Sequence, residues 1–245
     1  MLDTGISPNR LNGTLFLSPH SDDIAISSTY AILSKVFPQP LHLVTVFSLS
    51  SWVSPSYANN LEKKVISKIR VMEDRKFCSA LNITYHELPF EDCLLRHGDV
   101  IYDLSYTDNA CLLKSVCNYI YSIILSTNIN LICVPHPHGH LKHVDHVILH
   151  NVATLIATKH NISTIYLDDL PYSRLHVSYF DSSSPSFRYR RFELCLDESA
   201  LDKKSQLVSI YKSQLTPFIL DSLRMIAQGD SNNNITESIW IPVQS

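Results

Sequence analysis

Residues 16–23 read Phe16-Leu17-Ser18-Pro19-His20-Ser21-Asp22-Asp23, and the apolar run ends where a histidine and two aspartates begin. The run from Leu15 to Ser18 predicts a short buried strand, and Ile24 to Val36 predicts the helix that follows. A strand-to-helix turn places its side chains at the carboxyl edge of a sheet, where open α/β folds bind ligands. His20 and Asp23 are three residues apart, so both can converge on one point.

Helix capping is the ordinary alternative for these aspartates. An Asp at a helix start accepts hydrogen bonds from free backbone N–H groups, and the helix dipole favours its negative charge there. Taken alone, residues 16–23 support capping and metal binding about equally. A second stretch of the chain favours the metal.

The second stretch, residues 134–150, holds six of the 12 histidines of the chain: His136, His138, His140, His143, His146 and His150. It follows an apolar strand predicted at 130–134 and leads into a helix predicted from Val144 to Ile156. His143 and His146 are three apart, and His146 and His150 are four apart, so each pair can share a helix face. In a parallel sheet, both strand-to-helix junctions open on the same edge.

Strands and helices alternate along residues 14–160, which predicts a mostly parallel sheet with helices on both faces, a Rossmann-like α/β fold. Further strands are expected at 41–47, 83–88 and 165–168, and helices at 61–81 and 110–127. Beyond Pro171 the pattern predicts antiparallel strands at 174–180 and 187–196 and helices at 201–211 and 217–228. We expect one domain over 1–245, with a core of about 14–170 and a C-terminal extension of about 171–245.

The predicted helix at 61–81 is amphipathic. Its apolar spacing predicts that Val65, Ile69, Met72 and Phe77 face the core. Arg70 lies on the same helix, and its ordinary role would be a surface salt bridge to Glu73 or Asp74.

A catalytic zinc ion usually takes three protein ligands and leaves a position for water. His20, Asp23 and one histidine of residues 134–150 would supply two imidazoles and one carboxylate, a set that also suits iron(II). Water bound to zinc ionises near neutral pH. Asp22, the carboxylate left over, then suits a general base.

The other polar residues of the second stretch have several predicted roles. His143 would carry a proton to the leaving group or stabilise the oxyanion, and Asp145 would orient it. His150 is the main rival metal ligand because of its spacing from His146, although core packing explains it as well. Three loop histidines are expected to be solvated, or else to bind a second metal or the substrate: His136, His138 and His140.

The sequence Pro19-His20-Ser21-Asp22-Asp23, followed downstream by His143-Val144-Asp145-His146, resembles the PIG-L/LmbE-like family of zinc-dependent N-deacetylases. Three weaker patches are similar to that family in the expected order over residues 14–215: Arg70 with Glu73, Leu88 to Asp92, and Lys204 with Tyr211-Lys212-Ser213-Gln214. The chain departs from the family pattern at three places: Ser21 replaces a proline, Ile24 replaces an acidic residue, and Ser27-Ser28-Thr29 replaces glycines.

The resemblance implies a zinc-dependent hydrolase that removes an N-acetyl group from a small-molecule N-acetylglucosamine-type conjugate. It implies one zinc ion per chain, with the ligands His20, Asp23 and His146. The implied catalytic residues are Asp22 as general base and His143 as the electrophilic or acid partner, with Asp145 behind it. The implied substrate neighbours are Arg70 and Asp92.

Two other functions remain open. One is a non-catalytic sugar-binding relative, because Ile24 stands where the family commonly has an acidic residue. The other is a metal-dependent phosphoesterase, because clustered histidines and aspartates also build two-metal sites.

Composition sets the outer bounds. The 245 residues are 45% hydrophobic and 18% charged with a net charge of −3, which predicts a globular protein and no nucleic-acid partner. Six cysteines without a Cys-x-x-Cys pair predict free thiols in a reducing compartment, and hence a cytoplasmic location. We expect no secretory signal and no integral membrane segment, since no apolar run reaches the roughly 20 residues that span a bilayer. The oligomeric state, including a homo-oligomer, stays open.

Overall fold

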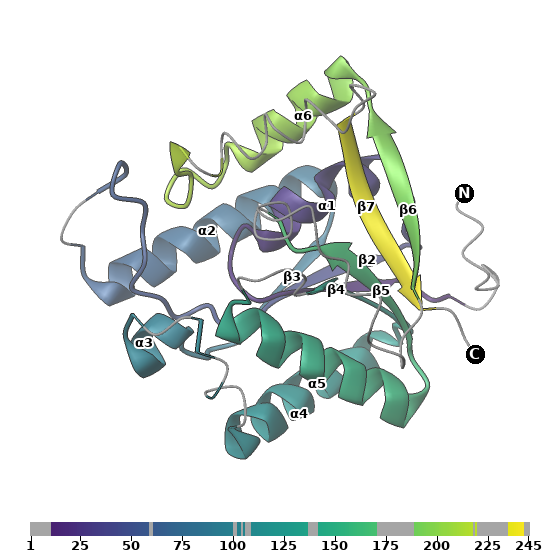
Figure 1. Ribbon diagram of the computed structural model, residues 1–245, viewed down its shortest axis with the longest axis horizontal. Coiled ribbons are helices and arrows are strands. Elements are labelled where there is room, and N and C mark those ends of the chain that lie inside the picture. Colours follow the sequence, from purple (N-terminus) through teal and green to yellow (C-terminus); the bar gives the residue numbers. More distant parts are fainter. Residues whose placement is uncertain are drawn as a thin grey trace.

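The computed structural model describes residues 11–58, 61–99, 102–103, 105, 109–136, 142–170, 189–217, 219 and 235–242. Its elements follow one another along the chain in the order shown in Figure 1: β1 (Thr14–Ser18), α1 (Asp23–Leu33), β2 (Leu41–Thr45), α2 (Lys63–Leu81), β3 (Thr84–Glu87), α3 (Cys93–His97), α4 (Ala110–Thr127), β4 (Leu131–His136), α5 (Val144–His160), β5 (Ser163–Asp168), β6 (Tyr189–Leu196), α6 (Glu198–Val208) and β7 (Ile235–Pro242).

Seven strands form one sheet in the order β3-β2-β1-β4-β5-β7-β6. The five strands from β3 to β5 are parallel, and β7 and β6 add to the β5 edge in antiparallel fashion. Phe16 of β1 pairs with Leu43 on one side and with Cys133 on the other. The predicted fold class, a mostly parallel sheet with antiparallel strands at the C-terminal end, is confirmed.

Helices cover both faces of the sheet, with α1, α2 and α6 on one face and α4 and α5 on the other (Figure 1). Strand β1 feeds both layers: Phe16 belongs to the core under α1 and α2, while Leu15 and Leu17 belong to the core under α4 and α5. A strand buried on both faces reads as a continuous apolar run, which is why β1 shows no alternation in the sequence.

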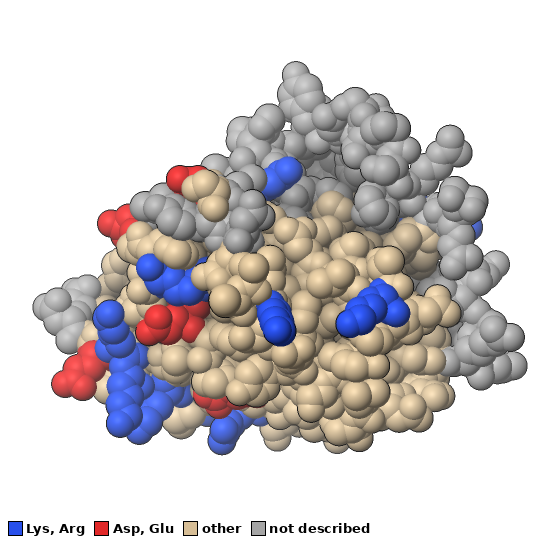
Figure 2. Space-filling view, turned by 90° about the horizontal axis from the view of Figure 1, so that it is seen from below, with Lys and Arg blue, Asp and Glu red and all other residues tan. Residues whose placement is uncertain are grey.

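The outer surface of α4 and α5 is poor in charge. Figure 2 looks at the molecule from this side; charged side chains gather at the left of the view, and its centre and right are mostly uncharged. Length and composition would allow α4 to cross a membrane, since its 18 residues have a mean hydropathy of 1.3. In this fold its buried side chains, Val116, Ile120 and Ile124, pack into the core beneath the sheet.

Helix α2 corrects one prediction about the core. Val65 is 40% exposed and Met72 is 56% exposed, whereas Arg70 and Asp74 lie in the interior beside Phe77. The apolar spacing failed here because the buried face of α2 is polar and is satisfied by hydrogen bonds from other elements, which hydrophobic periodicity does not register.

The C-terminal part contains a strand pair that was not predicted. Strand β6 runs antiparallel to β7 along its whole length, from Tyr189 opposite Pro242 to Leu196 opposite Ile235. The strand expected at 174–180 and most of the helix expected at 217–228 lie outside the described residues. Strand β7 was not expected, because its apolar run carries a buried glutamate, Glu237.

Glu237 anchors β7 to two helices. Its Oε1 lies 2.5 Å from Nζ of Lys204 on α6, and both side chains are buried. Its carboxylate also accepts hydrogen bonds from the backbone N–H groups of Tyr30 and Ala31 in α1. A buried carboxylate with a cationic partner and two amide donors is fully compensated, so this ion pair ties the C-terminal strand to the core.

Candidate metal centre

The predicted metal ligands meet at the carboxyl ends of β1 and β4. These two strands are neighbours in the sheet, and the strand order reverses between them, which is the topological switch point of an open α/β sheet. His20 and Asp23 lie on the turn from β1 into α1, and His143 and His146 lie at the start of α5. Two segments more than 100 residues apart therefore form one site.

Three donor atoms form a nearly equilateral triangle. Nδ1 of His20 lies 3.4 Å from Oδ2 of Asp23 and 3.3 Å from Nε2 of His146, and the latter two atoms are 3.5 Å apart. Zinc binds histidine nitrogen and carboxylate oxygen at about 2.0–2.2 Å, so two ligand atoms on a tetrahedral ion are separated by about 3.3–3.5 Å. The donor set and its spacing fit one zinc ion.

Each of the two imidazoles is held from behind by a carboxylate. Nε2 of His20 lies 2.9 Å from Oδ2 of Asp145, and Nδ1 of His146 lies 2.7 Å from Oδ1 of Asp169. An imidazole N–H that donates to a carboxylate leaves the other ring nitrogen as the metal ligand. These bonds leave Nδ1 of His20 and Nε2 of His146 as the ring nitrogens that could bind an ion.

Asp169, which contacts His146, is a residue that sequence reasoning missed. It directly follows β5, the neighbour of β4 in the sheet, and this position at the carboxyl edge was the available signal. Its neighbour Asp168 does have a structural role, because it accepts a hydrogen bond from Nε1 of Trp240.

His143 approaches the centre as a hydrogen-bond donor. It is the N-cap of α5, and its Nδ1 accepts the backbone N–H of Asp145 at 3.2 Å. The neutral ring must then carry its proton on Nε2, which lies 3.5 Å from Sγ of Cys93. His20, His143 and His146 also have donor atoms that all lie within 4.8 Å of one another. Because the cap uses Nδ1 of His143 and Nε2 then bears hydrogen, Asp23 fits the third ligand position better than His143.

The surroundings of His143 keep it neutral. Burial lowers its pKa well below the usual value, and the nearby His20 and His146 lower it further, against the opposing charge of Asp145. Its ring centroid is 4.8 Å from that of His20 and 5.0 Å from that of His146. A neutral Nε2–H group beside the metal ligands suits stabilisation of an oxyanion.

Asp145 sits elsewhere than predicted. We expected its carboxylate to orient His143, but the structure places it on His20, with further hydrogen bonds from the backbone N–H of Cys93 and from Arg96. Burial alone would raise the pKa of Asp145, but the hydrogen bond from His20 and the charges of His20 and Arg96 hold it well below the usual range. Asp145 is therefore a fixed anion.

Asp22 is not used as a helix cap. It occupies the N-cap position of α1 with φ 93° and ψ −31°, and among the described residues its side chain makes no capping hydrogen bond. A positive φ is sparsely populated for a non-glycine residue, and such strain concentrates at functional sites. Burial and the charge of Asp23 raise the pKa of Asp22 well above its usual value, against Arg70 and His20. A raised carboxyl pKa suits a general base.

The two predicted substrate neighbours, Arg70 and Asp92, both contact the loop that follows β2. Arg70 is buried and donates to Oγ of Ser50 at 2.7 Å, so it is not a surface ion pair. Its positive charge lowers the pKa of Asp22, against the effect of burial. Asp92 caps α3 by accepting the backbone N–H of Leu95, and helix capping accounts for this contact.

The Lys204…Tyr211-Lys212-Ser213-Gln214 patch fastens the C-terminal part onto α2. The hydroxyl of Tyr211 donates to Oδ1 of Asp74 at 3.0 Å, and the backbone N–H of Ser213 donates to Oε1 of Glu73 at 2.8 Å. Asp74 also accepts a hydrogen bond from Oγ of Ser21, which lies within the β1–α1 turn. The patch thus supports the site from behind.

The remaining histidines lie apart from the triangle. The rings of His150 and His136 are 4.7 Å apart, and both lie about 5 Å from the ring of Tyr166. His150 is thus part of an aromatic cluster and not of the three-donor groups found among the described residues. His138 and His140 lie outside those residues.

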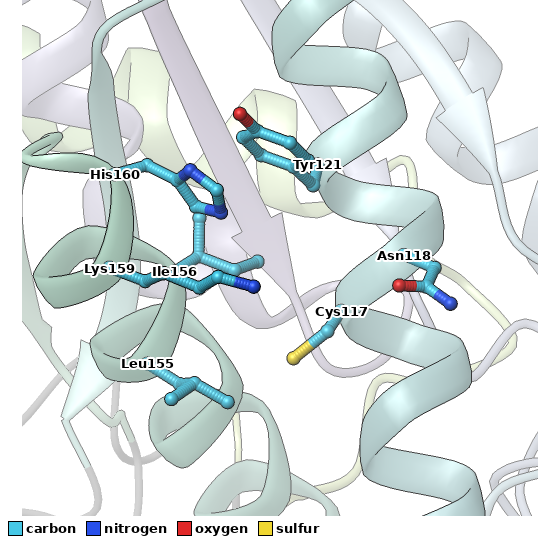
Figure 3. Close-up of a pocket in the computed structure, with 7 residues that line it drawn as sticks. All are labelled: Cys117, Asn118, Tyr121, Leu155, Ile156, Lys159 and His160. Carbon is cyan, nitrogen blue, oxygen red and sulfur yellow. The ribbon is translucent and has the colours of Figure 1, made fainter.

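A separate small hollow of about 120 Å³ lies between α4 and α5, and Figure 3 shows the side chains around it. The rings of Tyr121 and His160 stack across it at 3.7 Å. None of the predicted site residues lines it.

Comparison with known proteins places this geometry in context. The chain is 28% identical over 166 residues to the 2'-N-acetylparomamine deacetylase of Streptomyces fradiae, covering 67% of this chain and 59% of that protein. The chain thus matches less than two thirds of that relative's length.

Two solved structures share the fold. A deacetylase of the teicoplanin biosynthesis pathway has a TM-score of 0.74 and 21% identity, with 95% of this chain and 98% of that chain covered. The zinc-inhibited form of teicoplanin deacetylase Orf2 has a TM-score of 0.69 and 19% identity, with the same coverage.

The family comparison covers the site itself. The family model described as PIG-L, GlcNAc-PI de-N-acetylase, matches residues 15–157, which include both the β1–α1 turn and the start of α5. Since this match spans more than half of the 245 residues, the chain belongs to the PIG-L family of GlcNAc-PI de-N-acetylases.

Proposed function

We propose that this protein is a zinc-dependent hydrolase that removes the acetyl group from an N-acetylglucosamine-type conjugate. The observation that carries the proposal is the triangle of His20 Nδ1, Asp23 Oδ2 and His146 Nε2, with sides of 3.3–3.5 Å. Family membership and the deacetylase named in Streptomyces fradiae support the reaction type.

His20, Asp23 and His146 would hold the zinc ion. When bound, zinc would supply a Lewis acid that lowers the pKa of water and polarises the acetamide carbonyl. The carboxylates of Asp145 and Asp169 keep the two imidazoles in the tautomers that present the correct nitrogen.

Asp22 would take the proton of the attacking water. The raised pKa of its carboxyl group strengthens it as a base and allows it to keep that proton until the next step. As the C–N bond breaks, the same proton passes to the departing nitrogen, so that the products are acetate and a free amine. The positive charge of Arg70 opposes the rise in the pKa of Asp22.

His143 would donate the hydrogen bond from Nε2–H to the oxyanion. Its cap bond to the N–H of Asp145 fixes the ring, and burial keeps the ring neutral. A preorganised donor in a site that excludes water contributes about 3–4 kcal/mol to transition-state stabilisation. Because the neutral ring already bears the required hydrogen, no protonation of His143 is needed before the attack.

Acetate release from N-acetylated amino sugars tests the proposal. The zinc-loaded protein is incubated with N-acetylglucosaminyl-phosphatidylinositol and with 2'-N-acetylparomamine, the substrates that the matching family and relative name. The proposal expects acetate and free amine in equal amounts from one class of conjugate, and release slower by about 10²- to 10⁴-fold with Asp22→Asn. Sugar binding without acetate release would favour the non-catalytic relative, and phosphate release with two metal ions per chain would favour the phosphoesterase.

A further inference from the structure

The short helix α3 contributes two groups to the metal centre that the proposed mechanism does not use. The backbone N–H of Cys93 donates to Oδ2 of Asp145 at 2.8 Å, and Nη2 of Arg96 donates to Oδ1 of the same carboxylate at 2.5 Å. Asp92 caps the start of α3 and so fixes its orientation. The helix thus holds both oxygens of Asp145.

Arg96 is itself fixed on three sides. Its guanidinium carbon lies 4.9 Å from the ring centroid of Phe47, and its Nη1 donates to the backbone carbonyl of Glu91. The side chain is 11% exposed, and that of Asp145 is fully buried. A planar guanidinium that is stacked, hydrogen-bonded and partly desolvated holds a carboxylate in one geometry, which a solvated surface charge does not.

The carboxylate held in this way faces a proposed zinc ligand. Oδ2 of Asp145 accepts the hydrogen bond from Nε2 of His20, whose other nitrogen forms one corner of the 3.3–3.5 Å triangle. If Asp145 rotated, the Nε2–H of His20 would lose its acceptor, and the ring would no longer be held in the tautomer and plane that present Nδ1. Loss of such outer partners typically lowers metal affinity by about 10- to 100-fold.

We propose that Arg96 is a positioning residue for the metal: it locks Asp145, and Asp145 in turn locks His20 as a zinc ligand. This inference rests on the proposed function. In this proposal Arg96 does not contact the substrate. It raises zinc affinity through its contact with Asp145, which contacts His20, and it is not itself a zinc ligand.

The experiment measures zinc affinity by chelator competition, without substrate, in the wild type and in Arg96→Gln and Arg96→Lys. Arg75→Gln is the matched control, because Arg75 lies away from the site and its side chain is 65% exposed. Its guanidinium pairs with the carboxylate of Glu87 at 3.5 Å. We expect Arg96→Gln to weaken zinc binding by about 10- to 100-fold. Arg96→Lys keeps the charge near Asp145 but cannot reproduce the planar fork, so it should recover part of the loss. Arg75→Gln should leave the affinity unchanged.

Kinetics at saturating zinc separate the alternatives. The proposal expects an unchanged KM in Arg96→Lys once zinc is restored. An unchanged zinc affinity in both Arg96 variants would overturn the proposal. A raised KM with unchanged zinc affinity would mean that Arg96 contacts the substrate. A lower melting temperature alone would mean that Arg96 only packs in the fold. If zinc affinity falls as expected but no acetate is released from any amino sugar by the wild type, the proposed function fails while the role of Arg96 stands.

Discussion

Nε2 of His20 lies 2.9 Å from Oδ2 of Asp145, a residue 125 positions further along the chain. This contact connects the two halves of the metal centre, because His20 follows β1 and Asp145 lies in the first turn of α5. It leaves Nδ1 of His20 facing Asp23 and His146. The structure thus shows that Asp145 of the His143-Val144-Asp145-His146 motif contacts the histidine of the other motif.

Asp145→Asn should weaken zinc binding by about 10- to 100-fold, because the amide can no longer act as a negatively charged acceptor for the Nε2–H of His20. Chelator competition at neutral pH measures the change. Asp202→Asn on the exposed side of α6 is the matched control and should bind zinc like the wild type. An equal affinity in Asp145→Asn would mean that the 2.9 Å contact does not orient the ligand.

Asp22→Asn should keep zinc and lose turnover, because Asp22 lies outside the ligand triangle while its carboxyl group supplies the base. General-base catalysis contributes about 10²- to 10⁴-fold, so kcat should fall by that factor. Zinc content by elemental analysis and acetate release on the same preparation give both numbers. Full activity in this variant would dismiss Asp22 as the base, and loss of zinc would make it a ligand.

The stability of the zinc-free protein should fall as pH rises above neutrality. Burial lowers the pKa of His20, but hydrogen bonds to Asp145 and Asp23 outweigh burial and raise it from 6.5 to about 10. A group whose pKa is raised in the folded protein stabilises the fold fully at pH values below 6.5, the pKa in the unfolded chain. This stabilisation is lost as the pH rises through the pKa in the folded protein. The melting temperature between pH 7 and 8, below the pKa values of about 8.5 and 10 of ordinary thiols and phenols, should therefore decline less steeply in His20→Gln than in the wild type.

Zinc should remove the contribution of His20 to this slope, because the ion replaces the proton on Nδ1. Calorimetry at pH 8 in buffers of different ionisation enthalpy should show about one proton or more released per zinc bound, since the pKa of His146 is raised as well. Binding without proton release would contradict the assignment of His20 as a ligand.

Lys204→Met should destabilise the fold by about 3–5 kcal/mol, because it leaves Glu237 buried without its cationic partner. Lys203→Met on the exposed side of the same helix is the control and should change the free energy of unfolding by less than about 0.5 kcal/mol. Urea unfolding of the zinc-free protein measures both. Equal stability of the two variants would show that the amides of α1 suffice to hold Glu237.

The parallel sheet and the meeting of the two motifs could be predicted because their signals are local. Apolar runs that stop at His20 or shortly before His143 indicate strand ends, and parallel strands bring such ends to one edge. The sequence therefore predicted that His20, Asp23 and His146 lie together, and the structure brings them within 3.5 Å of one another.

The partners behind the ligands could not be predicted, because they depend on elements that the sequence pattern does not resolve. Helix α3 has five residues and lies between the helices expected at 61–81 and 110–127, where no helix was expected, so the contact of Arg96 with Asp145 had no signal. The contact of Asp169 with His146 depends on β5 lying next to β4 in register. Side-chain direction at these junctions is set by tertiary packing and not by spacing.

Buried polar residues account for the other errors. The core face of α2 carries Arg70, Glu73 and Asp74, so hydrophobic periodicity assigned the wrong face of this helix to the core. Strand β7 carries the buried Glu237, and hydrophobic periodicity did not predict this strand. In each case the carboxylates are satisfied by donors from distant elements, such as Tyr211 for Asp74. Such networks become visible only when the chain is folded.

The central claim is that one ion is shared by His20, Asp23 and His146, and anomalous diffraction at the zinc edge from crystals of the zinc-loaded protein tests it most directly. We predict a single zinc peak per site, about 2.0–2.2 Å from Nδ1 of His20, Oδ2 of Asp23 and Nε2 of His146. A peak coordinated by His143 in place of Asp23, or no peak between the two histidines, would contradict the account.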